Sequence, residues 1–172
     1  MSKRKMAAFV GLVPVGQLRR VNIGDVVVYD ADPCYSSIIS GVPGHDIEDV
    51  KLSNVRIYCR GGGTQEDAAL APPERENAYP EPSMFGKMPA HGFFIRHAKG
   101  LQMDNVEVGF LKEDLRPAFV LDDVKGAEFN NVKAQATAEV PTFVLKSVND
   151  FATHHCKPVA DMKLDRAEEK KL

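Results

Sequence analysis

LQMDNVEV, the sequence of residues 101–108, has apolar side chains at its first, third, sixth and eighth positions. Two period-2 pairs separated by a two-residue step are typical of two short strands that meet at a bend. The bend falls on Asp104 and Asn105, and both residue types tolerate the left-handed backbone conformation of a tight corner. This stretch therefore predicts a bent β-strand with one apolar face.

The same spacing recurs along the chain and indicates an internal repeat. The other copies begin at Val21, Val50 and Ala127, and their bends fall on Gly24-Asp25, Ser53-Asn54 and Asn130-Asn131. Leu101 and Ala127 are 26 residues apart, and no helical pattern intervenes. A period in the twenties with several short strands per repeat favours a right-handed parallel β-helix, in which each turn, or rung, buries its apolar face on the next. Leucine-rich repeats have a similar period, but their L-x-x-L-x-L spacing is absent.

We therefore expect an all-β chain whose residues 1–150 form about five rungs. A further short apolar strand precedes the later units: Phe93-Phe94-Ile95, Phe119-Val120-Leu121 and Phe143-Val144-Leu145. The 51-residue gap between Val50 and Leu101 breaks the period, and it contains a long loop insertion at residues 60–91. Aromatic and Met side chains predict that this loop is ordered over one sheet face. Residues 151–172 are expected to form a C-terminal cap or tail, with a short capping helix or a frayed tail from Asp161 to Leu172.

The composition is that of an ordinary globular protein and excludes several kinds of partner. Of the 172 residues, 44% are hydrophobic and 27% are charged, and the formal net charge is -2. No apolar run approaches the roughly 18 residues that span a bilayer. There is also no basic excess to bind a phosphate backbone. We therefore expect neither nucleic acid nor a membrane as a partner.

Cysteine and histidine spacing gives no sign of a metal site. Cys34, Cys59 and Cys156 lie far apart without a C-x-x-C pair, which argues against a zinc ribbon, a redox pair or a disulfide framework. His154 and His155 precede Cys156, but adjacent side chains rarely converge on one ion and no fourth ligand has suitable spacing. We expect no metal and no cofactor.

The first residues look like a secretory signal, with Lys3-Arg4-Lys5 before the apolar stretch from Met6 to Gly16. Pro14 interrupts this stretch and no small-x-small cleavage site closes it. We interpret Met6 to Val15 as part of a rung, which leaves the location of the protein undefined by the chain itself.

Several stretches carry a resemblance to a known family: GVPGHDIEDV at 41–50, YPEPSMFG at 79–86, HGFFIRH at 91–97 and RPAF at 116–119. They resemble the C-terminal part of bacterial proteins of glycoside hydrolase family 28, the polygalacturonase-like enzymes, from about Ala7 to Leu172. The resemblance implies a pectin-lyase-like β-helix and inverting hydrolysis of pectic polysaccharide without a metal or organic cofactor. It also implies an exported protein, periplasmic or extracellular.

The family's catalytic motifs are not found in the family's order, so no catalytic residue is assigned. Asp122-Asp123 matches an Asp-Asp doublet, and Gly44-His45-Asp46 nearly matches a Gly-His-Gly motif that should follow the doublet but precedes it here. No Arg-x-Lys follows Asp122. We interpret the doublet as a strand-end turn and His45 as a corner residue, and we expect the catalytic rungs upstream of Met1.

Five residues are better candidates for substrate contact: Tyr79, Glu81, Phe85, His91 and Arg96. Aromatic rings stack on sugar faces, and an arginine binds a uronate carboxylate through two parallel hydrogen bonds. A structural interpretation stays open, in which the loop only seals the flank of the β-helix and Arg96 pairs with Glu81.

Two functions follow from these observations. The first is the C-terminal portion of a polygalacturonase-like glycoside hydrolase, which supplies part of the substrate cleft and is inactive alone. The second is a stand-alone, non-catalytic β-helix module that binds a carbohydrate or a protein partner. The expected partners are a pectic oligosaccharide or polysaccharide and either the missing N-terminal half or further copies of the same chain.

Overall fold

The computed structural model describes residues 15–172 apart from 77, 79 and 80. These residues are mostly β-structure. The strands are β1 (Arg19–Ala31), β2 (Ser37–Ser40), β3 (Ile47–Gly61), β4 (Phe93–Lys112), β5 (Phe119–Asn130), β6 (Lys133–Ala134), β7 (Phe143–His154) and β8 (Met162–Lys171), with the short helices α1 (Gln65–Ala68) and η1 (Pro82–Phe85). Neither helix is long or apolar enough to cross a membrane. The Lys3-Arg4-Lys5 segment and most of the Met6 to Val15 stretch lie outside the described residues.

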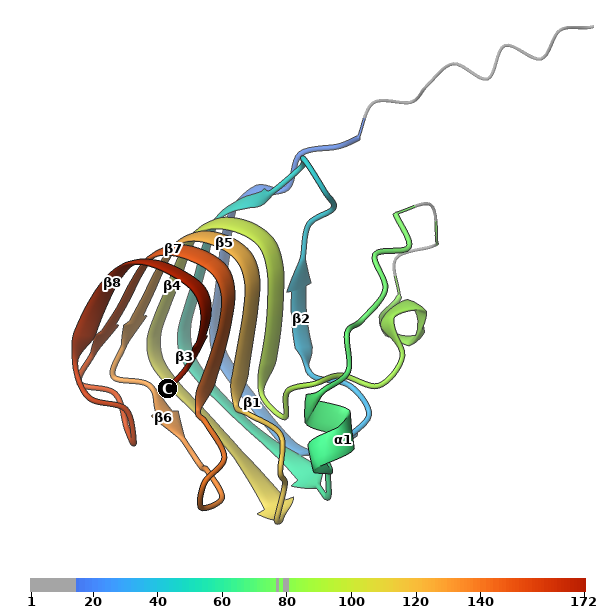
Figure 1. Ribbon diagram of the computed structural model, residues 1–172, viewed down its shortest axis with the longest axis vertical. Coiled ribbons are helices and arrows are strands. Elements are labelled where there is room, and N and C mark those ends of the chain that lie inside the picture. Colours follow the sequence, from blue (N-terminus) through green and yellow to red (C-terminus); the bar gives the residue numbers. More distant parts are fainter. Residues whose placement is uncertain (1–14, 77, 79–80) are drawn as a thin grey trace, which may run out of the picture.

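The strands form one mostly parallel mixed sheet in the order β1-β3-β4-β5-β7-β8 (Figure 1). The first five strands of this path run parallel, and only β8 is antiparallel to its neighbour. The register follows the sequence repeat, because Val50 is paired with Val21 on one side and with Leu101 on the other, and Leu101 is paired with Ala127. The predicted alignment of the repeat units is therefore confirmed.

The predicted bends are left-handed corners joined by a ladder of side chains. Asp25, Asn54, Asn105 and Asn131 have φ angles of 57°, 55°, 53° and 50°. The side-chain amide of Asn54 donates to Asp25 at 3.0 Å, that of Asn105 to Asn54 at 2.9 Å, and that of Asn131 to Asn105 at 3.1 Å. Asn and Asp suit these positions because they adopt the left-handed conformation readily. Their side chains also form hydrogen bonds with the Asn or Asp at the equivalent position of the next unit.

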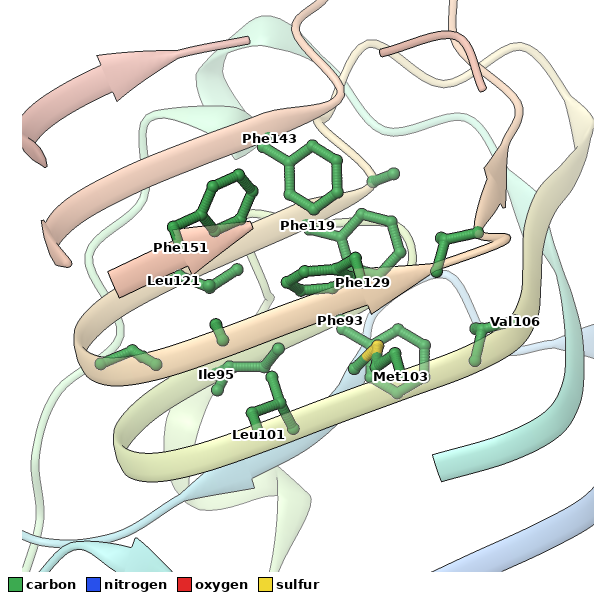
Figure 2. Close-up of a cluster of buried hydrophobic side chains, with 14 of the residues drawn as sticks. Phe93, Ile95, Leu101, Met103, Val106, Phe119, Leu121, Phe129, Phe143 and Phe151 are labelled. Atoms are coloured by element: carbon green, nitrogen blue, oxygen red, sulfur yellow. The ribbon is translucent and has the colours of Figure 1, made fainter. Parts of the chain in front are cut away.

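Phenylalanine rings fill the interior between the bent strands (Figure 2). Phe93, Phe119 and Phe143 occupy one register position, and their rings stack with centroids 5.7 Å and 4.8 Å apart. Phe129 meets the rings of Phe119 and Phe143 edge-on, and Phe151 packs beside Phe129. These five rings are at most 1% exposed. The alternate residues of each strand supply them because successive side chains of a strand point to opposite faces.

The loop at residues 60–91 packs over the outer face of the sheet, as predicted. Met88 and Ala90 are fully buried, and they contact Phe94 and Val120 on the side away from the phenylalanine core. Figure 1 shows this loop, with α1, on the same flank as β2. At the start of β4 and of β5, both faces of the sheet are therefore apolar. One face packs on the interior and the other on the loop.

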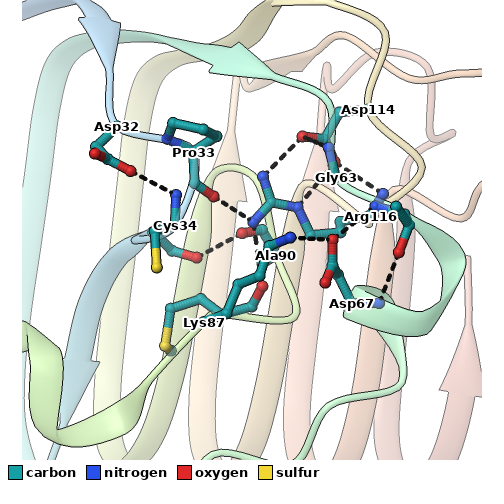
Figure 3. Close-up of polar contacts among 12 residues, drawn as sticks. Asp32, Pro33, Cys34, Gly63, Asp67, Lys87, Ala90, Asp114 and Arg116 are labelled. Carbon is teal, nitrogen blue, oxygen red and sulfur yellow. Dashed lines mark hydrogen bonds and ion pairs between the residues drawn. The ribbon is translucent and has the colours of Figure 1, made fainter.

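A buried ion pair holds the start of this loop (Figure 3). Arg116 and Asp114 are at most 1% exposed, and their side chains are joined at 2.7 Å and 2.9 Å. The carboxylate of Asp114 also accepts the amide N–H of Gly63 at 2.9 Å, and Arg116 donates to the carbonyls of Pro33 and Met88. A Cβ on Gly63 would lie 2.1 Å from Nε of Arg116, so only glycine fits there. The ion pair thus connects the segments around Pro33, Gly63 and Met88 to the residues that precede β5.

The capping helix or frayed tail predicted from Asp161 to Leu172 is wrong, because this segment forms β8. Met162, Leu164 and Ala167 repeat the apolar spacing of the earlier strands and lie opposite Thr153, Phe151 and Val148 of β7. A helix of ten residues is marginal by itself. The strand instead satisfies the edge of β7 and packs its apolar side chains on the core.

The three cysteines are free thiols in the structure. Cys59 is buried, and Cys34 and Cys156 are half-buried. Burial raises the pKa of Cys59 and of Cys156, so both thiols resist ionisation.

Candidate functional site

Three parallel strands present two rows of outward-facing side chains across the sheet. Phe94 of β4, Val120 of β5 and Val144 of β7 share one register position and form an apolar row. Two residues further along the same strands lies a charged row of Arg96, Asp122 and Lys146. Parallel pairing without a register shift fixes both rows, since each strand begins with a phenylalanine and these three residues are paired with one another.

A groove of about 440 Å³ lies over these rows. Phe94, Val120 and Val144 line it together with Asp122 and Lys146. Residues 68–72, at the end of α1 and after it, line one part of the groove, and residues 139–141 before β7 line another. Glu169 and Lys171 of β8 line it too, together with Gln65, Pro89, Leu115 and Pro117. The groove therefore combines an apolar surface with carboxylates that accept hydrogen bonds and ammonium groups that donate them.

Arg96 is held by the loop and does not line the groove. Its side chain is 4% exposed, and its guanidinium donates to the carbonyls of Pro72 and Pro73 at 2.8 Å and 3.2 Å. The carboxylate of Glu74 lies 3.0 Å from the same guanidinium. The Phe85 ring lies 5.7 Å from it, within cation–π range.

The structural interpretation paired Arg96 with Glu81. This pairing is wrong, because the acid that meets Arg96 is Glu74. Glu81 precedes the 3-10 helix η1 and its carboxylate instead accepts the hydroxyl of Ser83. The three residues from Pro72 to Glu74 supply every hydrogen-bond partner of the guanidinium that the structure gives. Arg96 therefore ties the loop to β4.

His91 lies in the interior, apart from the groove. It is 3% exposed, its ring meets the Phe110 ring edge-on at 5.3 Å, and its Nδ1 has no hydrogen-bond partner. Burial lowers the pKa of His91 to about 4, although the nearby Asp114 carboxylate acts in the opposite direction. His91 is therefore neutral in the folded protein at neutral pH.

Acid should destabilise the protein through His91. Its pKa is about 4 in the folded chain and 6.5 in the ordinary case, so between these values the unfolded chain binds a proton that the folded chain does not. The contribution of His91 to the free energy of unfolding is thus fully present above pH 6.5 and is lost as the pH falls toward 4. We expect His91→Gln to remove about 2 kcal/mol of the stability loss between pH 7 and pH 5, measured by urea unfolding. His154→Gln, at an exposed position, is the matched control, and an equal effect of the two substitutions would contradict the prediction.

The structure brings together only part of the predicted substrate-contact set. Phe85 and Arg96 are in contact, Glu81 is exposed before η1, and His91 is buried apart from them. Tyr79 lies outside the described residues. Their contact with a substrate stays a prediction.

Sequence reasoning missed the residues that line the groove, above all Val144 and Lys146. The three apolar triplets that begin with phenylalanine were recognised as strands, and aligning them would have placed their middle residues on one outer row. That alignment was the available signal. The loop residues opposite them carry no such signal, because their position depends on the folded loop.

The Asp-Asp doublet separates at a corner. Asp122 faces the groove, whereas Asp123 is a left-handed residue with φ 52° and its carboxylate lies 2.8 Å from Nδ1 of His97. The ammonium of Lys125 lies 3.1 Å from the Asp46 carboxylate and 3.9 Å from that of Asp123. His45 is exposed in the neighbouring turn, as predicted.

The corner is also the place where potential metal ligands gather in the described part of the chain. Asp46, His97 and Asp123 offer ligand atoms within 4.8 Å of one another. The Lys125 ammonium already lies near both carboxylates and offsets part of their charge. We therefore interpret this corner as a network of ion pairs.

Comparisons with protein-family models, with curated proteins and with solved structures found no match. The fold and the groove define a mostly β protein with a repeated parallel strand unit and an open groove of mixed polar and apolar lining over an apolar row. The family resemblance of the sequence stays a prediction, and function has to be inferred from this groove.

Proposed function

We propose that this chain is a right-handed parallel β-helix that holds a pectic oligosaccharide, as the C-terminal portion of a polygalacturonase-like glycoside hydrolase. The observation that carries the binding function is the groove over Phe94, Val120 and Val144 with Asp122 and Lys146 at its side. The chain itself is assigned no catalytic residue.

The β-helix is supported by the way in which successive strands repeat. Strands β1, β3, β4, β5 and β7 pair in parallel in this order, and left-handed residues recur at matching corners. Parallel strands joined by a crossover within one sheet are right-handed in nearly all proteins. The side-chain ladder from Asp25 to Asn131 keeps the corners in register along the stack.

The groove suits a sugar chain because it offers both kinds of contact that a pyranose needs. The C–H face of the ring packs on apolar side chains, and the hydroxyl groups donate to carboxylates such as Asp122. Lys146 and Lys171 supply cations for the carboxylate of a uronic acid. A uronic acid beside these lysines therefore gains an ion pair that a neutral sugar lacks, while hydroxyl groups of the chain meet the three carboxylates of the lining, Asp122, Glu139 and Glu169.

Hydrolysis with inversion needs two carboxyl groups that flank the bond with space for a water molecule. Asp122 lies in register between Arg96 and Lys146 on the groove side, and Asp123 is bound to His97 at the corner. The two neighbouring aspartates thus do not act on one bond. We expect the bound oligosaccharide to stay intact.

Lys146→Met should weaken the binding of an oligogalacturonate by about 10-fold, because a hydrogen bond to a charged group contributes about 1.5–3 kcal/mol. Isothermal titration calorimetry with a defined oligogalacturonate measures this loss. Chromatography of the same mixture shows whether the ligand is cleaved.

Lys99→Met is the matched control, since Lys99 is exposed and does not line the groove. Its affinity should equal that of the unmodified protein, and a neutral oligosaccharide of the same length should bind more weakly to both. Equal losses in the two variants, or no binding at all, would refute the proposal. Cleavage that disappears in an Asp122→Asn, Asp123→Asn variant would refute the non-catalytic assignment.

A further inference from the structure

The outer edge of β1 is an exposed apolar strand edge. In the part of the chain that the structure describes, β1 pairs only with β3. Val27 and Tyr29 are 72% and 70% exposed on its outer face, and Ile23 and Val28 are 43% and 37% exposed although their equivalents in β3 face the core. An edge of this kind is a template for pairing with another strand.

The other edge of the sheet is protected against such pairing. Strand β8 carries Lys163, Asp165, Arg166 and a run of charged residues from Glu168 to Lys171, most of them exposed. Charged side chains on an edge strand oppose association. A head-to-tail stack of copies, with β8 of one against β1 of the next, is therefore disfavoured.

The apolar pattern of β1 reads the same in both directions. Its inward side chains are Val21, Ile23, Val26 and Val28, so the steps between them are two, three and two residues. In an antiparallel pair, directly opposite residues lie on the same face of the sheet. Reversal of the strand therefore places Val21 opposite Val28 and Ile23 opposite Val26, with every inward side chain facing another.

We propose that a second copy of this chain pairs with β1, antiparallel, about a two-fold axis between Gly24 and Asp25. The left-handed corner at Asp25 then meets the same corner of the partner, so both strands bend together. The interiors of the two copies join into one core, which covers Ile23 and Val28. Because both copies use the same surface, the contact is closed and the assembly is a dimer.

The charges along β1 match this register. Arg19 lies opposite Asp30 of the second copy, and the symmetry produces this pair twice. Asp30 already accepts from Nε of Arg60 at 3.0 Å within its own chain, and a carboxylate has a second oxygen for another arginine. Arg20 lies opposite Tyr29, a pairing that allows a cation–π contact.

Sedimentation equilibrium of the full chain tests the proposal. The chain should be a dimer at micromolar concentration, and Ile23→Lys should raise the dissociation constant at least about 10-fold because it sets a charge against Val26 in the joined core. Leu111→Lys is the matched control, because Leu111 is 46% exposed and lies away from β1. Circular dichroism verifies that both variants are folded.

A charge exchange tests the register without placing a charge in the core. Arg19→Glu should raise the dissociation constant by about 10-fold, since two exposed ion pairs become two repulsions. Arg19→Glu combined with Asp30→Lys should restore it, whereas Arg60→Ala alone should leave it unchanged. A monomer at all concentrations, open-ended oligomers, or a dimer insensitive to Ile23→Lys would overturn the proposal.

Discussion

Arg116→Met should lower the free energy of unfolding by about 3–5 kcal/mol, because the variant leaves the Asp114 carboxylate buried without its cation. Both side chains are fully inaccessible, and the carboxylate receives two hydrogen bonds from the Arg116 side chain at 2.7 Å and 2.9 Å. The guanidinium also satisfies the carbonyls of Pro33 and Met88, which lose their donor. Urea unfolding followed by far-ultraviolet circular dichroism measures the loss.

Arg60→Met is the matched control, because it breaks an ion pair of similar length in water. Nε of Arg60 lies 3.0 Å from Asp30, and both side chains are more than half exposed. Exposed ion pairs contribute about 0–1 kcal/mol. Losses of equal size in the two variants would show that burial of the Asp114–Arg116 pair has no energetic consequence.

The loss in Arg116→Met should shrink as the pH falls. Burial raises the pKa of Asp114, but hydrogen bonds from Arg116 and Gly63 outweigh it and hold the pKa below its ordinary value of 3.8. The native pair thus stabilises the fold above that pH and loses its contribution as the carboxylate is protonated. Without Arg116, burial raises the pKa of Asp114, so the carboxylate of the variant is protonated, and its burial becomes less costly, at a higher pH than in the native protein.

The strand register of the fold was predictable because its determinants are local. The residue before Val55 and before Val106 is Asn, which adopts the left-handed conformation of a corner readily, and the same residues form the ladder between units. The cap was not predictable in this way. The charged residues from Glu168 to Lys171 favour a helix locally. They form a strand instead because they pair with the edge of β7, and no local sequence pattern reveals that edge.

The candidate site was predicted less well because its partners are distant in sequence. Arg96 was expected to pair with the loop or with a ligand, and the loop did supply its acid, but at Glu74. The choice between Glu74 and Glu81 depends on how the chain turns at Pro72 and Pro73, whose carbonyls bind the same guanidinium. Spacing alone does not carry that information.

Phe119→Ala should lower the free energy of unfolding by about 3–5 kcal/mol, the usual cost of removing a buried ring. Phe119 is fully buried at the centre of the aromatic core, with centroids 5.7 Å from Phe93, 4.8 Å from Phe143 and 5.3 Å from Phe129. The neighbouring strands are fixed by backbone pairing on both sides, so they cannot close the cavity. Chemical unfolding monitored by circular dichroism measures the change.

Two variants separate the cavity from the loss of a ring as such. Phe119→Leu keeps most of the volume and should cost about 1–1.5 kcal/mol, the range of volume-conserving core exchanges. Tyr35→Ala removes a ring that is 37% exposed and should change the free energy of unfolding by about 0.5 kcal/mol or less. If Phe119→Ala cost no more than Tyr35→Ala, the stacked phenylalanines would not be the main source of stability. We expect the stacked phenylalanines to be the main source of stability, because each ring is buried by the next unit along the sheet.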